Sequence, residues 1–198
     1  MIRRLLLILV VLAWCGPSLL LGQDRRQPEA KLRSVQADFT QEKHLRILGR
    51  PLVSKGRFIF QAPDSLRWEY LEPFRSVLLM HQGQVRKFIR SGGRMVEETG
   101  MDLSPMRIVM TKIGAWLDGR FTENDTFSVR RMEDGRIRLV PKDQGMRRII
   151  TAIELVPGER PGLLRSVTIF EGADDTTSLS FSQARLNRPV DPRLFVVP

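Results

Sequence analysis

The sequence predicts a mainly β domain, an antiparallel meander of short strands interrupted by one α-helix. Apolar and polar residues alternate with a period of two in several segments, which is typical of strands with one buried face. Turn-forming pairs such as Pro63–Asp64, Asp134–Gly135 and Pro157–Gly158 separate these segments, and such short connections favour antiparallel pairing. One further segment has apolar residues at spacings of three and four, which predicts a single amphipathic helix.

The expected strands follow from this alternation. Val35, Ala37 and Phe39 alternate with polar residues and open the series, after a possible short helix at 28–34. The segment 77–80 is apolar on both faces, which predicts a strand buried on both sides. Further strands are expected at 56–61, 66–71, 85–90, 127–132, 136–140, 149–156, 163–170 and 178–181.

The helix is expected from Pro105 to Leu117. Ser104 is a good N-cap residue, Pro105 suits the first helical position, and Gly119 can end the helix. Its apolar stripe consists of Met106, Val109, Met110, Ile113, Trp116 and Leu117. From the residues alone, this stripe is either sealed core at the end of a barrel or an adaptable binding surface, for which its methionines are suited.

The first residues resemble a targeting signal. Arg3 and Arg4 precede an apolar run at 5–14, and a polar stretch follows Gly22, which predicts a signal peptide over 1–22 and a single domain over 23–198. A membrane anchor is the alternative, but Gly16–Pro17 interrupts the run, which is shorter than a span requires. A second alternative is lipidation of Cys15, because Leu12-Ala13-Trp14-Cys15 resembles a lipobox with an unusually large residue before the cysteine.

The composition excludes several classes of protein. One cysteine and two histidines are too few for a disulfide scaffold or for a zinc site built on Cys and His. Lys and Arg number 32 against 22 Asp and Glu, a net charge of +10. No nucleic-acid-binding motif accompanies this charge, so we expect no nucleic-acid partner and at most a modest attraction to anionic membranes.

No catalytic constellation is visible, and we expect neither an enzyme nor a metal or cofactor site. His44 and His81 are the only imidazoles, and both are expected to be ordinary surface residues. No nucleophile elbow, P-loop or dinucleotide-binding motif occurs. The adjacent pairs Glu97–Glu98 and Asp174–Asp175 cannot act on one bond together, because neighbouring side chains in a strand point to opposite faces.

Three stretches carry a more specific pattern: SVQADFTQEKHL, LVSKGRFIFQAPDSLRWEYLEPF and VLLMHQGQVRKF. In their order and spacing they resemble the periplasmic lipoprotein carrier family, the LolA-like proteins. The matching positions are Phe39, Gln41, Gly56, Phe58, Pro63, Leu66, Trp68, Pro73, Gly83, Leu139 and Pro141. Later, LLRSVTIFEGADDTTSLSF and the ending from Phe195 to Pro198 also resemble the family, so the likeness covers nearly all of the chain after residue 34.

The resemblance implies an open, unclosed antiparallel β-barrel wrapped over a helical lid and enclosing an apolar cavity. It also implies a monomeric periplasmic carrier that shields the acyl chains of a lipoprotein or another lipid. Such a carrier receives its cargo from an inner-membrane transporter and passes it to an outer-membrane acceptor. A receptor of the same fold, anchored through a lipidated Cys15, is the alternative function, and a secreted enzyme on the same barrel is a more remote one.

Nine residues are candidates for the cavity wall and lid. Phe58 and Phe60 share one face, and Trp68 and Tyr70 share another. The full set is Phe58, Phe60, Trp68, Tyr70, Met106, Val109, Met110, Ile113 and Trp116. Flat aromatic and flexible apolar side chains suit a wall that fits an acyl chain without locking onto its shape.

Two positions depart from the family pattern. Carriers place an arginine that bonds the lid directly before the proline of the turn between strands two and three, but this chain has Ala62 before Pro63. Arg67 is nearby but is not the matching position. Phe74 stands in the following turn, where carriers are usually polar, and is either an exposed apolar contact or a buried turn aromatic.

Overall fold

The computed structural model describes residues 32–198 except 101–102, 118–119, 122–124, 161–162 and 173. Residues Lys31–Pro198 form one compact unit. The predicted signal peptide and Cys15 lie outside the described residues.

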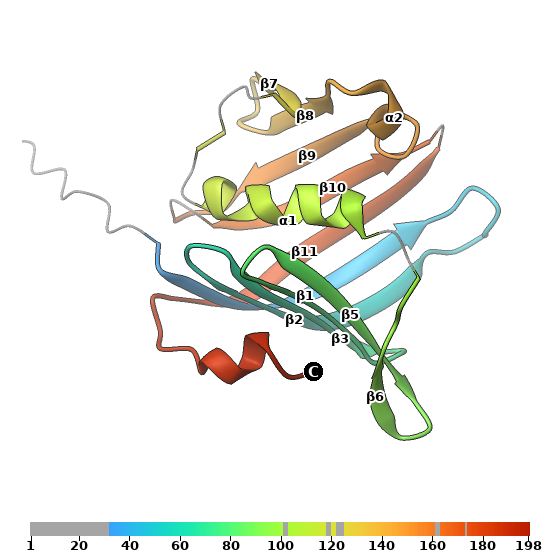
Figure 1. Cartoon of the computed structure of the whole chain (residues 1–198). Coiled ribbons are helices and arrows are strands. Elements are labelled where there is room, and N and C mark those ends of the chain that lie inside the picture. Colours follow the sequence, from blue (N-terminus) through green and yellow to red (C-terminus); the bar gives the residue numbers. More distant parts are fainter. Residues whose placement is uncertain (1–31, 101–102, 118–119, 122–124, 161–162, 173) are drawn as a thin grey trace, which may run out of the picture. The chain divides into compact units, whose positions relative to one another are not determined.

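One antiparallel sheet of eleven strands organises this unit, in the order β6-β5-β4-β3-β2-β1-β11-β10-β9-β8-β7 (Figure 1). The first strands along the chain are β1 (Ser34–His44), β2 (Leu52–Gln61), β3 (Ser65–Glu72), β4 (Ser76–His81), β5 (Gln84–Ser91) and β6 (Arg94–Glu97). The later strands are β7 (Phe127–Arg131), β8 (Ile137–Pro141), β9 (Ala152–Pro157), β10 (Leu164–Glu171) and β11 (Asp175–Leu186). The edge strands β6 and β7 are not paired with each other, so the sheet is open, and the predicted mainly β, unclosed antiparallel architecture is confirmed.

The two halves of the sheet are joined through the long pairing of β1 with β11. Phe39 lies opposite Phe181 on β11 and opposite Gly56 on β2. Since opposite residues of antiparallel strands point to the same side, these pairings place the apolar members of both meanders on one face. We call this the inner face and the other side the outer face.

The helix α1 (Ser104–Leu117) packs against the inner face (Figure 1). Its predicted start and end agree with the structure to within one residue. Met110 and Trp116 from α1 belong to the same buried cluster as Leu66, Leu139 and Leu155 from both halves of the sheet. The amphipathic stripe is therefore partnered by both meanders, as its helical spacing requires.

The outer face is covered locally by the C-terminal segment. The short helix η1 (Pro192–Phe195) contacts β3 and β4. Arg67 on β3 donates from Nη1 to the carbonyl oxygens of Leu194 at 3.1 Å and Val197 at 2.8 Å. This contact explains why an arginine in the middle of a strand is only 6% exposed.

The doubly apolar segment predicted at 77–80 is confirmed as part of β4. Leu78 and Met80 point to the inner core, whereas Val77 and Leu79 form a second buried cluster with Phe88.

Several sequence-based expectations need correction. The short helix expected at 28–34 does not occur in its described part, because residues 32–33 are irregular and β1 begins at Ser34. The strand β6, the short helix α2 (Gln144–Arg147) and η1 were not predicted, because each is only four residues long and shows no full period. Strand β11 extends well beyond the expected 178–181, because its ends are polar but remain paired with β1.

Candidate functional site

Aromatic side chains from three neighbouring strands gather on the inner face. The ring of Trp68 lies 5.4 Å from that of Phe39 and 5.5 Å from that of Phe58, measured between centroids. The ring of Tyr70 meets Phe39 edge-on at 5.2 Å. Phe58 and Trp68 are direct cross-strand partners, so the aromatic residues of β2 and β3 share one face of the sheet rather than two.

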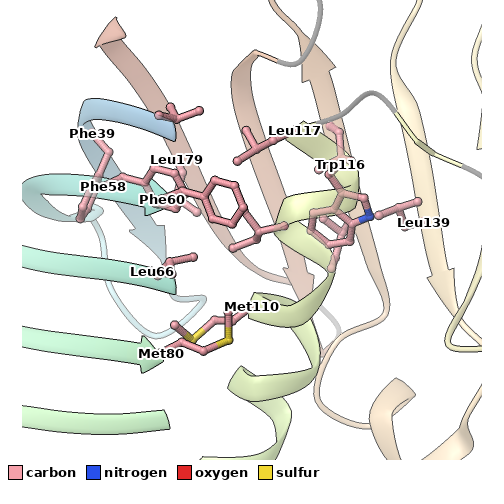
Figure 2. Close-up of a cluster of buried hydrophobic side chains, with 14 of the residues drawn as sticks. Phe39, Phe58, Phe60, Leu66, Met80, Met110, Trp116, Leu117, Leu139 and Leu179 are labelled. Atoms are coloured by element: carbon pink, nitrogen blue, oxygen red, sulfur yellow. The ribbon is translucent and has the colours of Figure 1, made fainter. Parts of the chain in front are cut away.

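The helix α1 belongs to the same core cluster as Phe39 and Phe58, and Figure 2 shows it beside the strands that carry them. Met110, Ile113 and Trp116 are all buried, at 2%, 9% and 5% exposure. Trp116 packs against Phe127 with ring centroids 6.2 Å apart. Figure 2 shows Met110 beside Met80, with α1 lying between the strands that carry Phe60 and Leu139.

Gly114 lets α1 approach β2 closely. A Cβ atom at this position would lie 3.1 Å from Cζ of Phe60 and 3.5 Å from the carbonyl oxygen of Pro63. Both distances are at or below ordinary van der Waals contact, so the helix rests directly on the end of β2 and on the turn that follows.

An apolar pocket of about 80 Å³ lies between the sheet and α1. Four predicted wall residues line it: Phe58, Trp68, Ile113 and Trp116. Its volume is far below the roughly 300–1,000 Å³ of sites for drug-sized ligands. This pocket is therefore too small for an acyl chain, and the acyl-sized cavity expected from the sequence stays a prediction.

The remaining predicted residues divide into two groups. Phe60, Tyr70 and Met110 belong to or pack against the same core cluster but do not line the pocket. Met106 and Val109 lie within α1, and their side chains are outside the described part of the structure.

Much of the pocket wall was not predicted. The missed residues come from α1 and from strands at both ends of the chain: Val35, Ala37, Leu117, Leu163, Leu164, Val167, Ile169, Leu179, Phe181 and Ala184. The alternation of Val167 with Ile169, and of Leu179 with Phe181, was present in the sequence. It predicts a buried face but not that β11 folds back beside β1, which places these residues opposite α1.

A few polar groups lie within this apolar region. The Tyr70 hydroxyl donates to Oε1 of Gln41 at 2.8 Å. Burial raises the pKa of Tyr70 to about 12, and the neighbouring Trp68 indole offsets this only in part. Nε1 of Trp68 is buried and has no hydrogen-bond partner.

Neither Ala62 nor Arg67 supplies the lid-bonding arginine that the family pattern places before Pro63. Ala62 is partly buried against the core, next to the place where Gly114 meets Pro63. Arg67 lies on the outer face and holds the C-terminal segment, so it does not contact α1 through the bonds it makes. Phe74 is 84% exposed, which rules out the buried alternative for this turn.

The imidazoles and carboxylate pairs have structural partners. His44 is exposed as expected. His81 is half-buried: its Nδ1 lies 2.8 Å from Oγ of Ser65, and its ring is stacked on that of Phe195. The expectation that His81 is an ordinary surface residue is therefore wrong. Glu97 pairs with Arg86, while Glu98 pairs with Lys87.

Within the described part of the chain, no three Asp, Glu, His or Cys side chains converge as a metal site would require. In the same part, no helix has the length and apolar character needed to cross a membrane.

Comparison with known proteins agrees with this architecture. Residues 30–198 match the family model described as "Outer membrane lipoprotein carrier protein LolA". The chain belongs to the LolA family. A LolA-family relative from Methylococcus capsulatus, described as an outer-membrane lipoprotein carrier protein, is 27% identical over 211 aligned positions, which cover 97% of this chain and 91% of the relative. Both descriptions name a lipoprotein carrier.

Solved structures of distant proteins are also similar. A LolA superfamily protein from Nitrosomonas europaea aligns with a TM-score of 0.40 and 9% identity, over 83% of this chain and 90% of that one. One chain of the MucA/MucB complex from Pseudomonas aeruginosa aligns with a TM-score of 0.44 and 16% identity, over 83% of this chain and 56% of that one.

Proposed function

We propose that this LolA-family protein is a periplasmic carrier that shields the acyl chains of a lipoprotein, or of another acylated lipid, between the inner face and α1. In this role it takes cargo from an inner-membrane transporter and delivers it to an outer-membrane acceptor. The observation that carries the proposal is the apolar inner face, built from both halves of an open sheet and covered by one amphipathic helix. Family membership supports the same role.

The closed pocket indicates how cargo is held and released. A pocket of about 80 Å³ has no room for a long acyl chain, so α1 must move away for cargo to enter. Burying an acyl chain is worth about 0.8 kcal/mol per methylene group. Moving α1 takes Trp116 off the pocket wall and Met110 out of the surrounding core cluster, so cargo and helix compete for one apolar surface. This exchange keeps the net affinity low enough for cargo to leave when α1 returns.

The contact of Gly114 with Phe60 and Pro63 takes the place of the family's arginine in this account. Where the family would use hydrogen bonds from an arginine at position 62, this chain has a small residue and a close helix-to-turn approach. The closed lid is then held by packing, which is non-directional and easily replaced by an acyl chain.

Lipid mass spectrometry of the natively purified protein tests the proposal. We expect acylated lipid to co-purify with the wild-type chain and to be lost in Trp116→Asp and Met110→Asp, since each places a charge where acyl chains would lie. Thr111→Asp is the matched control, because Thr111 is exposed on the same helix, and we expect it to retain lipid.

Circular dichroism separates loss of binding from loss of folding. The account expects strand content close to wild type in both buried-site variants. If both variants unfold, Met110 and Trp116 are structural core and the lid role is wrong. If wild type and variants alike carry no lipid, the carrier role is wrong.

The mass of the N-terminus of the same sample distinguishes a cleaved, soluble carrier from a form lipidated at Cys15.

A further inference from the structure

The hairpin that connects β1 and β2 ends in exposed apolar side chains (Figure 1). Ile47 in the connecting loop is 85% exposed, and Leu48, Leu52 and Val53 are each at least 41% exposed. Single apolar residues are ordinary on a protein surface, but four aliphatic side chains gathered at 47–53 are not. Such a cluster indicates a surface that becomes buried against a partner.

These apolar side chains point to more than one side of the hairpin. Leu52 and Val53 are consecutive residues of β2 that both pair with β1, and consecutive residues of a strand point to opposite faces. Ile47 and Leu48 lie beyond these pairs, in the loop itself. A groove on a partner protein covers one face of a strand pair, whereas a lipid layer surrounds an inserted tip on every side. The arrangement therefore fits a lipid layer better than a protein groove.

The charges of this hairpin suit the anionic surface of a phospholipid bilayer. The stretch 43–55 contains no acidic residue and four basic ones, Lys43, Arg46, Arg50 and Lys55. The whole chain has a net charge of +10, which attracts it to anionic headgroups.

Acidic residues of neighbouring elements neutralise part of this charge. Nitrogen and oxygen atoms lie 3.1 Å apart in Lys43–Glu171, 3.7 Å in Arg46–Asp174 and 3.8 Å in Lys55–Glu72. The last two pairs are open to solvent, so they are weak, and a lipid phosphate can compete for their cations. Arg50 is exposed beside the tip and forms no ion pair within the described part of the chain.

We propose that the end of the β1–β2 hairpin docks the protein on the surface of an anionic phospholipid bilayer. Ile47 and Leu48 enter the boundary between headgroups and acyl chains, and Arg50 contacts the lipid phosphates. The inference goes beyond the proposed carrier function, because it concerns a different part of the molecule from the pocket and states which end of the sheet faces the membrane. The opposite end of β2 leads to Pro63, where α1 rests through Gly114, so docking does not involve that contact.

Tryptophan fluorescence at the tip tests the contact directly. Ile47→Trp is mixed with vesicles of equal parts phosphatidylcholine and phosphatidylglycerol, in which the phosphatidylcholine carries bromine atoms on its acyl chains. After subtraction of the wild-type signal, we expect the added emission to shift to shorter wavelength and to be quenched. Quenching reports on position 47 itself, so this readout is valid whether or not Cys15 carries a lipid.

Val196→Trp is the matched control for this measurement. Val196 is also an exposed aliphatic residue, and it follows Phe195, whose ring stacks on His81. His81 ends β4, and the start of β4 follows the turn after Glu72, which pairs with Lys55 of the hairpin. Val196 therefore lies near the end of β4 away from the hairpin, and we expect its replacement to show no quenching.

Partition into vesicles of the same lipids without bromine measures the contribution of the apolar tip. The sample is the form of the protein whose N-terminal mass shows no lipid on Cys15. Ile47→Asp should lower the partition coefficient at least about tenfold, the factor that burial of one aliphatic side chain provides. Val196→Asp introduces the same charge elsewhere and should leave the partition coefficient unchanged.

Three results would overturn the inference. They are an Ile47→Trp emission that brominated lipid does not quench, a partition coefficient that Ile47→Asp does not change, and a wild-type dimer that Ile47→Asp dissociates. In the last case, the hairpin contacts a second copy of the chain instead of a membrane.

Co-purified lipid separates this inference from the carrier function. Ile47→Asp should retain the same lipid as the wild type, because the hairpin is remote from the contact of α1 with the turn after β2. A wild type that docks on vesicles but carries no lipid would contradict the carrier function and leave this inference standing. A wild type that carries lipid but is not quenched at position 47 would do the reverse.

Discussion

Gly56 on β2 lies so close to its neighbours that there is no room for a side chain at this position. A Cβ atom there would lie 2.6 Å from Cζ of Phe39 and would also collide with the backbone carbonyl of Glu69. The ring of Phe39 thus covers the glycine directly and remains free to meet Trp68 and Tyr70. The absence of one side chain on β2 positions the aromatic group of the site.

We expect Gly56→Ala to lower the free energy of unfolding by at least about 2 kcal/mol, because either the ring or the strand must shift. Gly49→Ala is the control, since nothing lies within 4 Å of the Cβ it would add. Urea unfolding of both variants gives the comparison. Equal stability of the two would mean that Phe39 moves aside at no cost.

Glu69 is the residue whose ionisation affects stability most clearly. Burial alone would raise its pKa, but hydrogen bonds from Arg67 at 3.1 Å and Arg75 at 3.0 Å outweigh burial and lower the pKa below the ordinary value of 4.5. A carboxylate with a lowered pKa stabilises the fold fully above its unfolded pKa, and this stabilisation is lost as the pH falls through the folded pKa.

Glu69→Gln is therefore expected to cost about 2 kcal/mol at neutral pH, where it removes a buried charged hydrogen-bond acceptor. The difference from wild type should shrink as the pH falls through the lowered pKa of folded Glu69, because wild-type Glu69 then becomes protonated as well. Unfolding measured across this range checks the prediction. Glu72→Gln is the control, because Glu72 is exposed and its Oε2 lies 3.8 Å from Nζ of Lys55; this substitution should change the free energy of unfolding little at any pH. A cost for Glu69→Gln that does not vary with pH contradicts the role given to ionisation.

At the scale of elements, the helix α1 and the turn after β2 meet through a glycine. Larger side chains at position 114 must push α1 away from Phe60 and Pro63. If α1 is a lid held by packing, such substitutions destabilise the closed state more than the sheet beneath it.

We expect Gly114→Val to weaken the closed state by about 1.4 kcal/mol, and so to increase the population open to ligand about tenfold. Uptake of a fluorescent long-chain fatty acid measures this. Thr111→Val introduces the same side chain at an exposed position of α1 and should leave uptake unchanged. Slower uptake by Gly114→Val, with the fold intact, would show that this contact does not restrain the helix.

The sequence predicted individual elements better than it predicted their partners. Alternation and turn pairs placed most strands, and the stripe of α1 placed the helix, because both are local patterns. Most of the pocket wall was missed. The missed residues at 163–184 reach the wall only because β11 returns to pair with β1 across most of the chain length, and no local pattern specifies that pairing. The position of His81 was misjudged for the same reason, because its ring is covered by Phe195 of the C-terminal segment.

For the whole molecule, the account depends on one movement. The inner face is apolar over both halves of the sheet, and among the described residues α1 packs against it and leaves a pocket of about 80 Å³. Binding and release are then two positions of one helix over one surface. A protein in which α1 never leaves the sheet cannot be a carrier of this kind.

A cysteine pair that links α1 to the sheet tests this most directly. Met80 and Met110 lie beside each other in Figure 2, and Cys15 is the only cysteine of the natural chain. In the variant with both methionines replaced by cysteine, the two thiols are joined by a short bis-methanethiosulfonate cross-linker, because a direct disulfide requires closer Cα atoms than two methionines that meet through their side chains provide. Fatty-acid uptake is measured on the cross-linked sample and again after a reductant has removed the linker. The account predicts no uptake in the cross-linked protein and uptake restored by reduction. Equal uptake in both states, with the cross-link verified by mass, would contradict it.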